Sequence, residues 1–289
     1  MAVTGLLPGQ RRRRLAGKTI MVYATVAFFL ITTLLPFVWM AISSVKPNRE
    51  LYNLEQSPFV VYSPTLEHYG YLFTKYPFAR WMLNTFAVSV ISTAFSLVIG
   101  ILGGYSLARL RFRGAEAMGL GIFITYLVPR TLLFVPLVYV MKLLGLFDSI
   151  WSLVIVYPTF LIPFCTWLLM GYFRSIPREL EECAMIDGCS RMGALFKIVL
   201  PLCLPGIVSA GLFAFTLSWS EFIYALTFIQ SAANKTVSVG AVGALTVGDT
   251  FFWGSLMGAA LLGSVPVALI YSFFMEYYVK GLVAGAVKG

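Results

Sequence analysis

Residues 81–108 of the chain read WMLNTFAVSVISTAFSLVIGILGGYSLA, a stretch that contains no Asp, Glu, Lys or Arg. A helix needs about 20 predominantly apolar residues to cross the hydrocarbon core of a bilayer. Three further stretches reach that length without a charged residue, and two more are interrupted only once, by Arg130 or by Glu221. These five stretches are residues 19–45, 117–141, 149–173, 198–234 and 250–275. The sequence therefore predicts an all-α, polytopic membrane protein with six transmembrane helices.

The composition excludes the soluble classes of protein. Of the 289 residues, 59% are hydrophobic and 11% are charged, whereas a soluble domain carries about 25% charged residues. The 24 Phe, 15 Tyr and 6 Trp are spread along the chain, which excludes a disordered, collagen-like or disulfide-scaffold protein. A net charge of +9 would suggest nucleic acid for a soluble protein. In a membrane protein it indicates basic residues held on the cytoplasmic side.

The distribution of Lys and Arg predicts the orientation. With the N-terminus inside, 14 of the 21 basic residues lie in cytoplasmic segments and 6 in outer segments. Both termini are therefore expected in the cytoplasm. The apolar run after residues 11–14 is longer than the roughly 7–15 residues of a secretory signal, which favours an uncleaved first helix. Four tryptophans fall at predicted outer ends of spans, as in an aromatic belt: Trp39, Trp81, Trp151 and Trp253.

The predicted organisation has four parts. Residues 1–19 form a basic cytoplasmic tail, and residues 20–80 contain the first helix and the longest outer loop. Residues 81–280 form a core of five helices, interrupted by a cytoplasmic loop at 174–200. Residues 281–289 form a C-terminal cytoplasmic tail.

The cytoplasmic loop contains an acidic segment, residues 174–188, which reads RSIPRELEECAMIDG. Ser175 and Pro177 are helix-start signals and Gly188 is a helix-stop signal, so a short helix is expected here, with a second one between Ser190 and Pro201. Leu180 and Ile186 offer apolar anchors, and Ala184 and Gly188 would leave room on one face for another backbone. The alternative is a helix lying on lipid. Because membrane surfaces are anionic, an acidic helix favours docking on a protein.

This segment resembles the loop of permease subunits in binding-protein-dependent ABC importers. The family pattern is E-A-A, three residues, G, nine residues, I, one residue and L-P, and the chain has Glu182-Cys183-Ala184, Gly188, Ile198 and Leu200-Pro201 at the same spacing. Three further elements resemble the carbohydrate-uptake branch, in particular the second permease of maltose-type systems. They are Asp187-Gly188, Trp219-Ser220-Glu221-Phe222 and the ending GLVAGAVKG at 281–289. The departures are Cys183 and Cys189, where Ala is usual.

The resemblance implies a type I ABC importer permease fold and a set of partners. These are a cytoplasmic ATPase dimer, a second and different permease chain, and a periplasmic or extracellular sugar-binding protein. ATP and Mg would bind the ATPase, so the chain itself is expected to be no enzyme and to hold no cofactor. The residues expected at the ATPase are Glu181, Glu182, Cys183, Ala184, Ile186, Asp187 and Gly188 in the loop, and Gly285, Ala286, Val287, Lys288 and Gly289 in the tail.

The predicted function is the permease subunit of an ATP-driven importer of a disaccharide or oligosaccharide in a bacterial cell (inner) membrane. One alternative keeps the ABC permease and changes the solute to peptide, phosphate or polyamine. A secondary transporter or channel is disfavoured because inverted repeats and pore-lining charges are not apparent. A membrane-embedded enzyme is disfavoured because Arg130 and Glu221 alone make a poor catalytic set.

Two charged residues and several aromatics are candidates for the substrate path. Glu221 is the only acidic residue well inside a span, so it lies beside the path, pairs with Arg130, or makes a structural helix–helix contact. Arg130 follows Pro129, and Pro136 lies close behind, which predicts an irregular span. Aromatic faces and hydrogen-bonding groups bind sugars, although packing accounts for most aromatics in such a chain. The aromatic candidates are Trp219, Tyr224 and Tyr126.

The remaining features are interpreted as structural. The four cysteines lack metal or redox spacing and are expected to fill space as small apolar groups. His68 is the only histidine, and we expect it to be solvated in the outer loop, with no metal site. Gly100-x-x-x-Gly104 and Gly254-x-x-x-Gly258 allow close helix packing, within the bundle or against a second permease.

Overall fold

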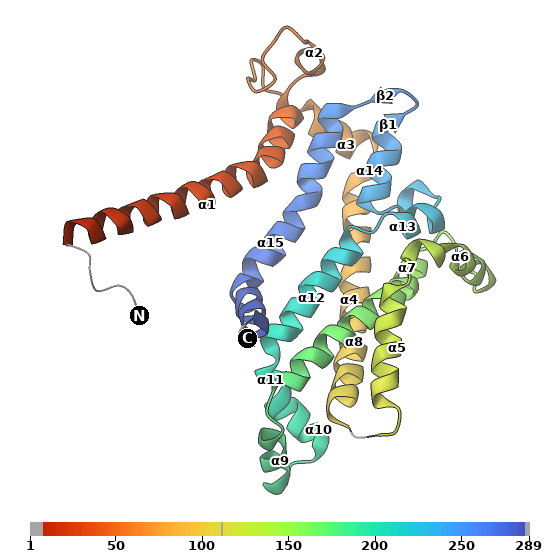
Figure 1. Ribbon diagram of the computed structural model, residues 1–289. Coiled ribbons are helices and arrows are strands. Elements are labelled where there is room, and N and C mark those ends of the chain that lie inside the picture. Colours follow the sequence, from red (N-terminus) through yellow and green to blue (C-terminus); the bar gives the residue numbers. More distant parts are fainter. Residues whose placement is uncertain (1–7, 111, 287–289) are drawn as a thin grey trace. The chain divides into compact units, whose positions relative to one another are not determined.

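A computed structural model describes the backbone of residues 8–110 and 112–286 and the side chains of residues 18–110 and 112–277. The chain is predominantly helical (Figure 1). Its longer helices are α1 (Pro8–Val45), α4 (Phe78–Arg109), α5 (Ala115–Leu127), α8 (Pro158–Ser175), α12 (Leu204–Trp219) and α15 (Trp253–Ala286). Shorter helices are α2 (Asn48–Leu51), α3 (Glu67–Lys75), α6 (Phe134–Leu143), α7 (Ile150–Val156), α9 (Glu179–Ile186), α10 (Arg191–Ala194), α11 (Leu200–Leu202), α13 (Ile223–Phe228) and α14 (Val237–Leu245). The remaining elements are the 3-10 helices η1 (Arg130–Leu132) and η3 (Ala232–Asn234), the π-helix η2 (Leu195–Val199), and strands β1 (Thr246–Val247) and β2 (Thr250–Phe251).

The chain divides into two compact units. One comprises residues 1–71 and 251–261, and we call it the first unit. The other comprises residues 72–250 and 262–289, and we call it the second unit. The second unit contains every candidate residue of the loop and of the substrate path.

Among the described residues, four helical segments are long and apolar enough to cross a membrane, and a bent pair brings the number to five. The bent pair is Arg191–Leu202 with Leu204–Trp219, at an angle of 76°. The predicted span at 117–141 is not among them, because this stretch forms the two separate helices α5 and α6, each shorter than a crossing requires. The four segments are Lys18–Val45, Phe78–Arg109, Ile150–Ser175 and Trp253–Tyr277.

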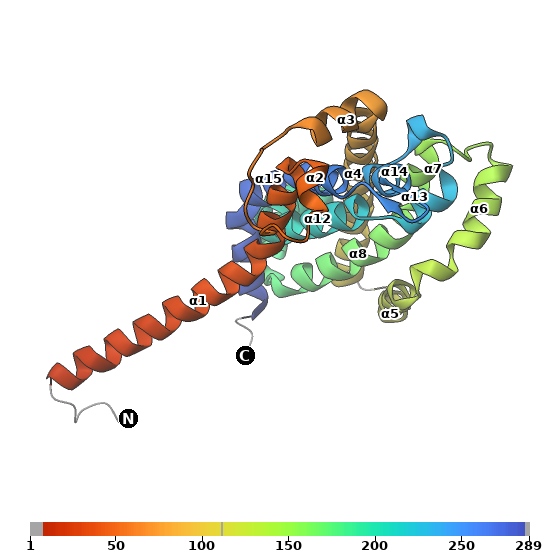
Figure 2. The same ribbon diagram turned by 90° about the horizontal axis from the view of Figure 1, so that it is seen from above.

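The break between α5 and α6 has a local cause. Proline disfavours the helical conformation of the residue before it, and Val128, which precedes Pro129, is extended with a ψ of 126°. The chain re-enters a helix only through the short η1 turn, and α6 then leaves in a different direction (Figure 2). The irregularity predicted from the prolines is confirmed as a break at Pro129, whereas Pro136 lies within α6.

The core of the second unit is built on α4, which packs along α8 and α12 (Figure 1). Gly100 and Gly104 lie against Cys165, Thr166 and Met170 of α8, so this glycine pair serves packing within the bundle. The close approach buries an apolar cluster around the two helices. Its fully buried members include Leu161, Cys165, Leu169, Phe173 and Ala210.

Gly104→Ala is expected to destabilise the protein, although Ala normally stabilises a helix over Gly by about 0.5–1 kcal/mol. A Cβ at this position would lie 3.0 Å from the backbone nitrogen of Met170 and 3.1 Å from the carbonyl oxygen of Thr166, and backbone atoms do not yield easily. We expect a loss of about 1–3 kcal/mol, measured as a lower unfolding midpoint in detergent. Gly121→Ala in α5 is the control, because its Cβ would meet nothing within 4 Å. Equal midpoints for the two variants would contradict this packing.

One of the tryptophans expected at the membrane interface is instead part of the core. Trp81 is 2% exposed, packs on Gly240 of α14, and donates its indole N–H to the carbonyl oxygen of Ala232 at 2.6 Å. The position of Trp81 at the start of α4 predicted a place at the membrane interface. The ring is buried instead, because it contacts α14 and donates a hydrogen bond to a backbone carbonyl group. Trp39, Trp151 and Trp253 are exposed, as a belt requires.

Asp148 connects the turn before α7 to the segment after α13. Its Oδ1 accepts backbone hydrogen bonds from Gln230 and Ser231, both at 2.9 Å, and Asn234 donates to its carbonyl oxygen at 2.6 Å. The backbone N–H of Ser231 above all, helped by that of Gln230 and by the Ser231 hydroxyl, holds the pKa of Asp148 below its ordinary value. The ionised carboxylate is therefore the form that holds this turn together.

A pH-dependent stability follows from Asp148. Because its pKa is lower in the folded protein than in the unfolded chain, its contribution is present above the unfolded pKa of about 3.9 and is lost as the pH falls through the folded pKa. Below about pH 4, the unfolding midpoint of the wild type should fall more steeply than that of Asp148→Asn. Asp249→Asn, in an exposed turn, should keep the wild-type slope. Parallel curves for wild type and Asp148→Asn would refute the assignment.

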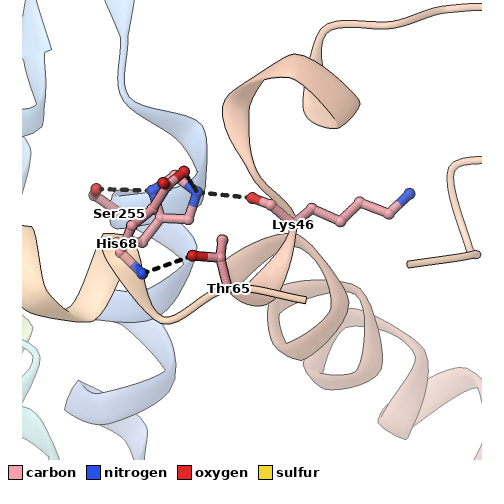
Figure 3. A network of polar contacts seen from close by, with 5 residues as sticks. Lys46, Thr65, His68 and Ser255 are labelled. Atoms are coloured by element: carbon pink, nitrogen blue, oxygen red, sulfur yellow. Dashed lines mark hydrogen bonds and ion pairs between the residues drawn. The ribbon is translucent and has the colours of Figure 1, made fainter. Parts of the chain in front are cut away.

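The first unit corrects the expectation for His68. The side chain is 4% exposed rather than solvated, and its ring nitrogens contact the carbonyl oxygen of Lys46 at 2.8 Å and the hydroxyl of Ser255 at 3.3 Å (Figure 3). Thr65 caps the turn by accepting the backbone N–H of Glu67 at 3.1 Å. Gly254 leaves the space that the imidazole ring fills. The histidine therefore ties α3 to the ends of α1 and α15, which a sequence without spatial information does not reveal.

Candidate functional site

The acidic segment forms the short helix α9, and a second helical stretch follows it as α10, η2 and α11. Helix α9 ends at Ile186, and Gly188 turns the chain with a φ of +90°, a conformation that favours glycine. Ser190 then caps α10, because its hydroxyl accepts the backbone N–H of Gly193 at 3.1 Å. Figure 1 shows α9 and α10 at the end of the second unit where α4 and α8 also end. The predicted stop at Gly188 and restart at Ser190 are confirmed.

Helix α9 has one exposed and one buried face. Ile186 is 84% exposed and Leu180 is 45% exposed, so the described part of the chain leaves two large apolar side chains on α9 largely uncovered. Ala184 is 8% exposed and packs inward, so it does not share an open face with Gly188 as we expected. The small side chain serves packing inside the second unit instead. The predicted loop residues on the exposed side are Glu182, Cys183, Ile186, Asp187 and Gly188.

The four cysteines also differ in how far they are buried. Cys165 and Cys203 are buried, which confirms their interpretation as small apolar fillers. Cys183 is exposed on α9, and Cys189 is half-buried. The filler interpretation is therefore wrong for Cys183.

A buried polar cluster joins α9 to the end of α4. Glu181, 6% exposed, accepts a short hydrogen bond from the Tyr105 hydroxyl and lies 3.5 Å from Nε of Arg109. Arg109, 7% exposed, also donates from Nη2 to the carbonyl oxygen of Ile176 at 2.9 Å. Nε of Arg109 has no hydrogen-bond partner in the described structure, so its link to Glu181 is ionic. We call Tyr105, Arg109 and Glu181 the α4–α9 cluster.

A second arginine reinforces this connection from the other side. Arg178, just before α9, donates from Nη2 to the carbonyl oxygen of Ala108 at 3.1 Å. Lys and Arg side chains near a helix C-terminus can satisfy the last carbonyl groups, which otherwise lack partners. The end of α4 and the start of α9 are thus held by groups from both elements, and we expect them to move together.

Sequence reasoning identified Glu181 but missed Tyr105 and Arg109. The available signal was that Arg109 directly ends a charge-free stretch, at the depth where a charge needs a partner. Glu181 lies on the inward side of α9, three residues before Ala184. Matching these two charges required knowing that the end of α4 lies beside the start of α9.

Glu221 holds the beginning of α13. Its Oε1 accepts the backbone N–H of Tyr224 at 2.9 Å, and its Oε2 accepts that of Ala225 at 3.1 Å. The Tyr157 hydroxyl donates to the same Oε2 at 3.1 Å. The carboxylate therefore satisfies free N–H groups in the first turn of a short helix.

Arg130 lies at the break between α5 and α6, with its guanidinium carbon 4.8 Å from the centre of the Phe160 ring. Of the alternatives for Glu221, the ion pair with Arg130 does not occur, since no salt bridge joins these two described side chains. Both residues nevertheless line one cavity of about 460 Å³. Tyr224 lies at the same cavity and donates its hydroxyl to the carbonyl oxygen of Arg130 at 2.8 Å.

The other two aromatic candidates lie elsewhere. Trp219 is 7% exposed, donates its indole N–H to the carbonyl oxygen of Gly263 at 3.1 Å and stacks on Phe215. Tyr126 is exposed, with its ring centre 5.7 Å from that of Phe164. The structure therefore brings together three of the five predicted path residues: Arg130, Glu221 and Tyr224.

The predicted tail residues fall at the limit of the described chain. Gly285 and Ala286 end the backbone of α15, and Val287, Lys288 and Gly289 lie outside the described residues. Within the side chains that the structure describes, no group of three or more His, Cys, Asp or Glu residues is placed to hold a metal ion.

Comparison with known proteins gives the same family as the loop motif. Residues 96–283 match the family described as the inner membrane component of binding-protein-dependent transport systems. The chain is 38% identical to the sulfoquinovosyl glycerol transport system permease protein SmoH of Agrobacterium fabrum, over 92% of this chain and 93% of that protein. It is 30% identical to the trehalose/maltose transport system permease protein MalG of Thermococcus litoralis, over 94% of this chain and 98% of that protein.

A solved structure supports the fold. A chain of a bacterial ABC transporter that imports the acidic polysaccharide alginate superposes with a TM-score of 0.74, covering 96% of this chain and all of that chain at 19% identity. At that identity the likeness establishes the fold alone, which is that of an ABC importer permease. The resemblance seen in the loop is thereby confirmed, and the chain belongs to the family of inner membrane components of binding-protein-dependent transport systems.

Proposed function

We propose that the chain is a permease subunit of an ATP-driven sugar importer. The observation that carries the proposal is the match along most of the chain to permeases of sugar transport systems, with relatives named for sulfoquinovosyl glycerol and for trehalose and maltose. A disaccharide or oligosaccharide-sized solute fits this group. The chain carries no ATPase motif that the sequence reveals, so ATP and Mg would bind a separate cytoplasmic ATPase dimer.

The proposed topology has six crossings. Helices α5 and α6 together make the third, broken at Pro129, and α10 to α12 make the bent fifth. Broken helices are tolerated in a membrane where they are buried in protein or line a cavity. Both termini would lie in the cytoplasm of a bacterial cell with the chain in the inner membrane, as the Lys and Arg distribution predicts. The tail 1–19, the region 20–80, the core 81–280 with its loop 174–200, and the tail 281–289 remain the proposed parts.

The proposed mechanism is alternating access driven through α9. The exposed side of α9, with Leu180 and Ile186, would fit a groove on the ATPase, and the C-terminal tail would reach the ATPase dimer. Closure of the ATPase on ATP would then move α9 as a rigid body. Such a change requires that the partner bind the two states with different affinity.

The α4–α9 cluster would carry that movement into the membrane. A force on α9 reaches α4 through the Glu181–Arg109 ion pair and the Tyr105 hydrogen bond, all within a buried site. Buried charges keep their pairing because separating them costs several kcal/mol, on the order of 3–5. Movement of α4 would open the solute path to the outer side, where a binding protein delivers sugar, and a second permease chain would complete the path.

Co-purification in mild detergent tests the proposal. The tagged chain should retain a soluble ATPase and a second multi-span permease, both identified by mass spectrometry. Reproducible absence of an ATPase from the purified material would contradict the proposed function.

Glu221 provides a prediction for the solute path. Glu221→Gln replaces one of the two carboxylate oxygens by an NH2 group, which accepts no hydrogen bond, so at least one of the donors Tyr157, Tyr224 and Ala225 loses its acceptor. We expect a stability loss of about 1–2 kcal/mol, seen as a lower unfolding midpoint, together with weaker uptake. Glu116→Gln, at an exposed carboxylate of α5 outside this cavity, is the control for the loss of a charge alone. Wild-type midpoint and uptake in Glu221→Gln would show that the carboxylate is dispensable packing.

A further inference from the structure

The guanidinium of Arg130 has no counter-charge among the described residues of the second unit. It lies over the Phe160 ring at the break between α5 and α6, and no carboxylate of the described residues is within 4 Å of it. Arg130 is also the one basic residue in the middle of a predicted membrane stretch, residues 117–141. A cation at that depth is costly and normally faces a partner or a water-filled cavity.

Glu221 does not supply the missing counter-charge, although it lines the same cavity. Its two oxygens already accept three hydrogen bonds, from Tyr224, Ala225 and Tyr157. Two of these come from the first turn of α13, where the positive end of the helix balances the carboxylate. The carboxylate of Glu221 therefore already accepts hydrogen bonds within the fold. The five N–H donors of the Arg130 guanidinium, by contrast, make no hydrogen bond to the described residues.

The contact with Phe160 does not compensate for a charge at membrane depth. A cation–π interaction contributes about 0.5–2 kcal/mol, less than the cost of a charge at membrane depth. Its effect is geometric, since stacking fixes the plane of the guanidinium. An arginine held in this way is suited to bind a carboxylate or sulfonate through two parallel hydrogen bonds.

The rest of the cavity is suited to a sugar ring. Thr131 and Ser220 bring hydroxyl groups to its wall, and the Ser220 hydroxyl donates to the carbonyl oxygen of Thr216 at 2.8 Å, which leaves its oxygen free to accept from a sugar hydroxyl. Phe222 and Tyr224 add aromatic carbon. The volume of about 460 Å³ is within the range of small-molecule sites, which begins at roughly 300 Å³.

We propose that this cavity binds the acidic group of an anionic sugar, with Arg130 as the residue that selects a carboxylate or sulfonate over a neutral hydroxymethyl group. The inference rests on the proposed function and narrows its solute class to acidic sugars. A neutral sugar would leave the guanidinium donors without an ionic acceptor, so the site discriminates between the two classes.

Chemical labelling of Arg130 tests the binding without ATP or transport. The complete importer, purified in detergent, is treated with phenylglyoxal, which modifies accessible guanidinium groups, and adducts at each arginine are measured by mass spectrometry. The probes are methyl glucuronide, its sulfonate counterpart methyl sulfoquinovoside, and neutral methyl glucoside. We expect the two acids to lower labelling of Arg130 severalfold, methyl glucoside to leave it unchanged, and labelling of the exposed Arg113 to be unaffected by all three.

Four outcomes would overturn the proposal. Equal protection by methyl glucoside would show a site without charge selection, and no protection by any probe would show no sugar site. Failure of Arg130 to react in the assembled importer would indicate that a carboxylate of the second permease already occupies it. Protection by phosphatidylglycerol vesicles instead of the acidic sugars would assign the residue to lipid.

Uptake into proteoliposomes distinguishes failure of this inference from failure of the proposed function. With Arg130→Met, the half-saturating concentration for an acidic solute should rise about ten- to a hundredfold, since a charge-assisted hydrogen bond is lost, and Arg130→Lys should restore part of it. The inference alone would be overturned if the wild type and Arg130→Met carried a neutral solute equally well and the wild type carried no acidic solute better than the variant. Absence of ATP-dependent sugar uptake by the wild-type importer would instead refute the proposed function, whatever the labelling shows.

Discussion

Glu181→Gln is expected to separate ATP hydrolysis from transport in the assembled importer. The substitution leaves Arg109 as a buried cation without its ionic partner, and breaking a buried pair from one side costs about 3–5 kcal/mol. The link between α9 and α4 would loosen while the exposed side of α9 is unchanged. We expect ATPase activity to persist in proteoliposomes and sugar uptake to fall by at least about tenfold.

Two further variants make this prediction specific. Glu116→Gln removes an exposed carboxylate from α5 rather than from α9 and should retain wild-type uptake. The exchange Arg109→Glu with Glu181→Arg should recover part of the uptake that each single change abolishes, because it restores opposite charges at the two positions. Undiminished uptake by Glu181→Gln would show that the cluster does not transmit movement.

Ile186→Glu is expected to release the ATPase from the permease. Ile186 is the most exposed large apolar side chain of α9 at 84%, and a partner that covers it gains apolar contact. A carboxylate buried at the same place would lack a partner, and such changes at the centre of an interface cost about 2 kcal/mol or more. The yield of ATPase that co-purifies with the permease should fall severalfold.

Phe112→Glu is the matched control for Ile186→Glu. Phe112 is also a large apolar residue, 41% exposed, but it lies in the segment between α4 and α5 rather than on α9. Its substitution should leave the ATPase yield near that of the wild type. Equal yields from Ile186→Glu and wild type would show that the partner does not cover this side of α9.

Much of the helical organisation could be predicted from the sequence. Long charge-free stretches have few ways to fold in a membrane other than as helices, and those at 81–108 and 250–275 coincide with α4 and most of α15. The stop at Gly188 and the restart at Ser190 were also predictable, because positive φ and side-chain capping are local properties. The prolines predicted an irregular span at 117–141, but the continuous apolar pattern did not show that α5 and α6 are two separate helices.

The contacts of the site could be predicted only in part, because they depend on which distant elements meet. Arg109 and Glu181 are far apart in the sequence, and their pairing appears only when the ends of α4 and α9 are adjacent. Glu221 stood out in the sequence as an acidic residue within a predicted span. Its backbone partners in α13 could not be predicted, because the apolar pattern does not show that a new helix begins after Glu221. His68 was misinterpreted for the same reason, since its burial comes from Gly254 and Ser255, far along the chain.

The exposed side of α9 is proposed to bind a separate ATPase, and a crosslinker attached to Cys183 allows a direct measurement of that contact. Its thiol is exposed on α9, whereas those of Cys165 and Cys203 are buried, so a photoactivatable maleimide can be attached to Cys183 in a Cys189→Ser background. After illumination of native membranes, the account predicts a covalent product between this chain and an ATPase subunit, lost when Ile186→Glu is introduced. Products with phospholipid alone, or none with an ATPase, would contradict it.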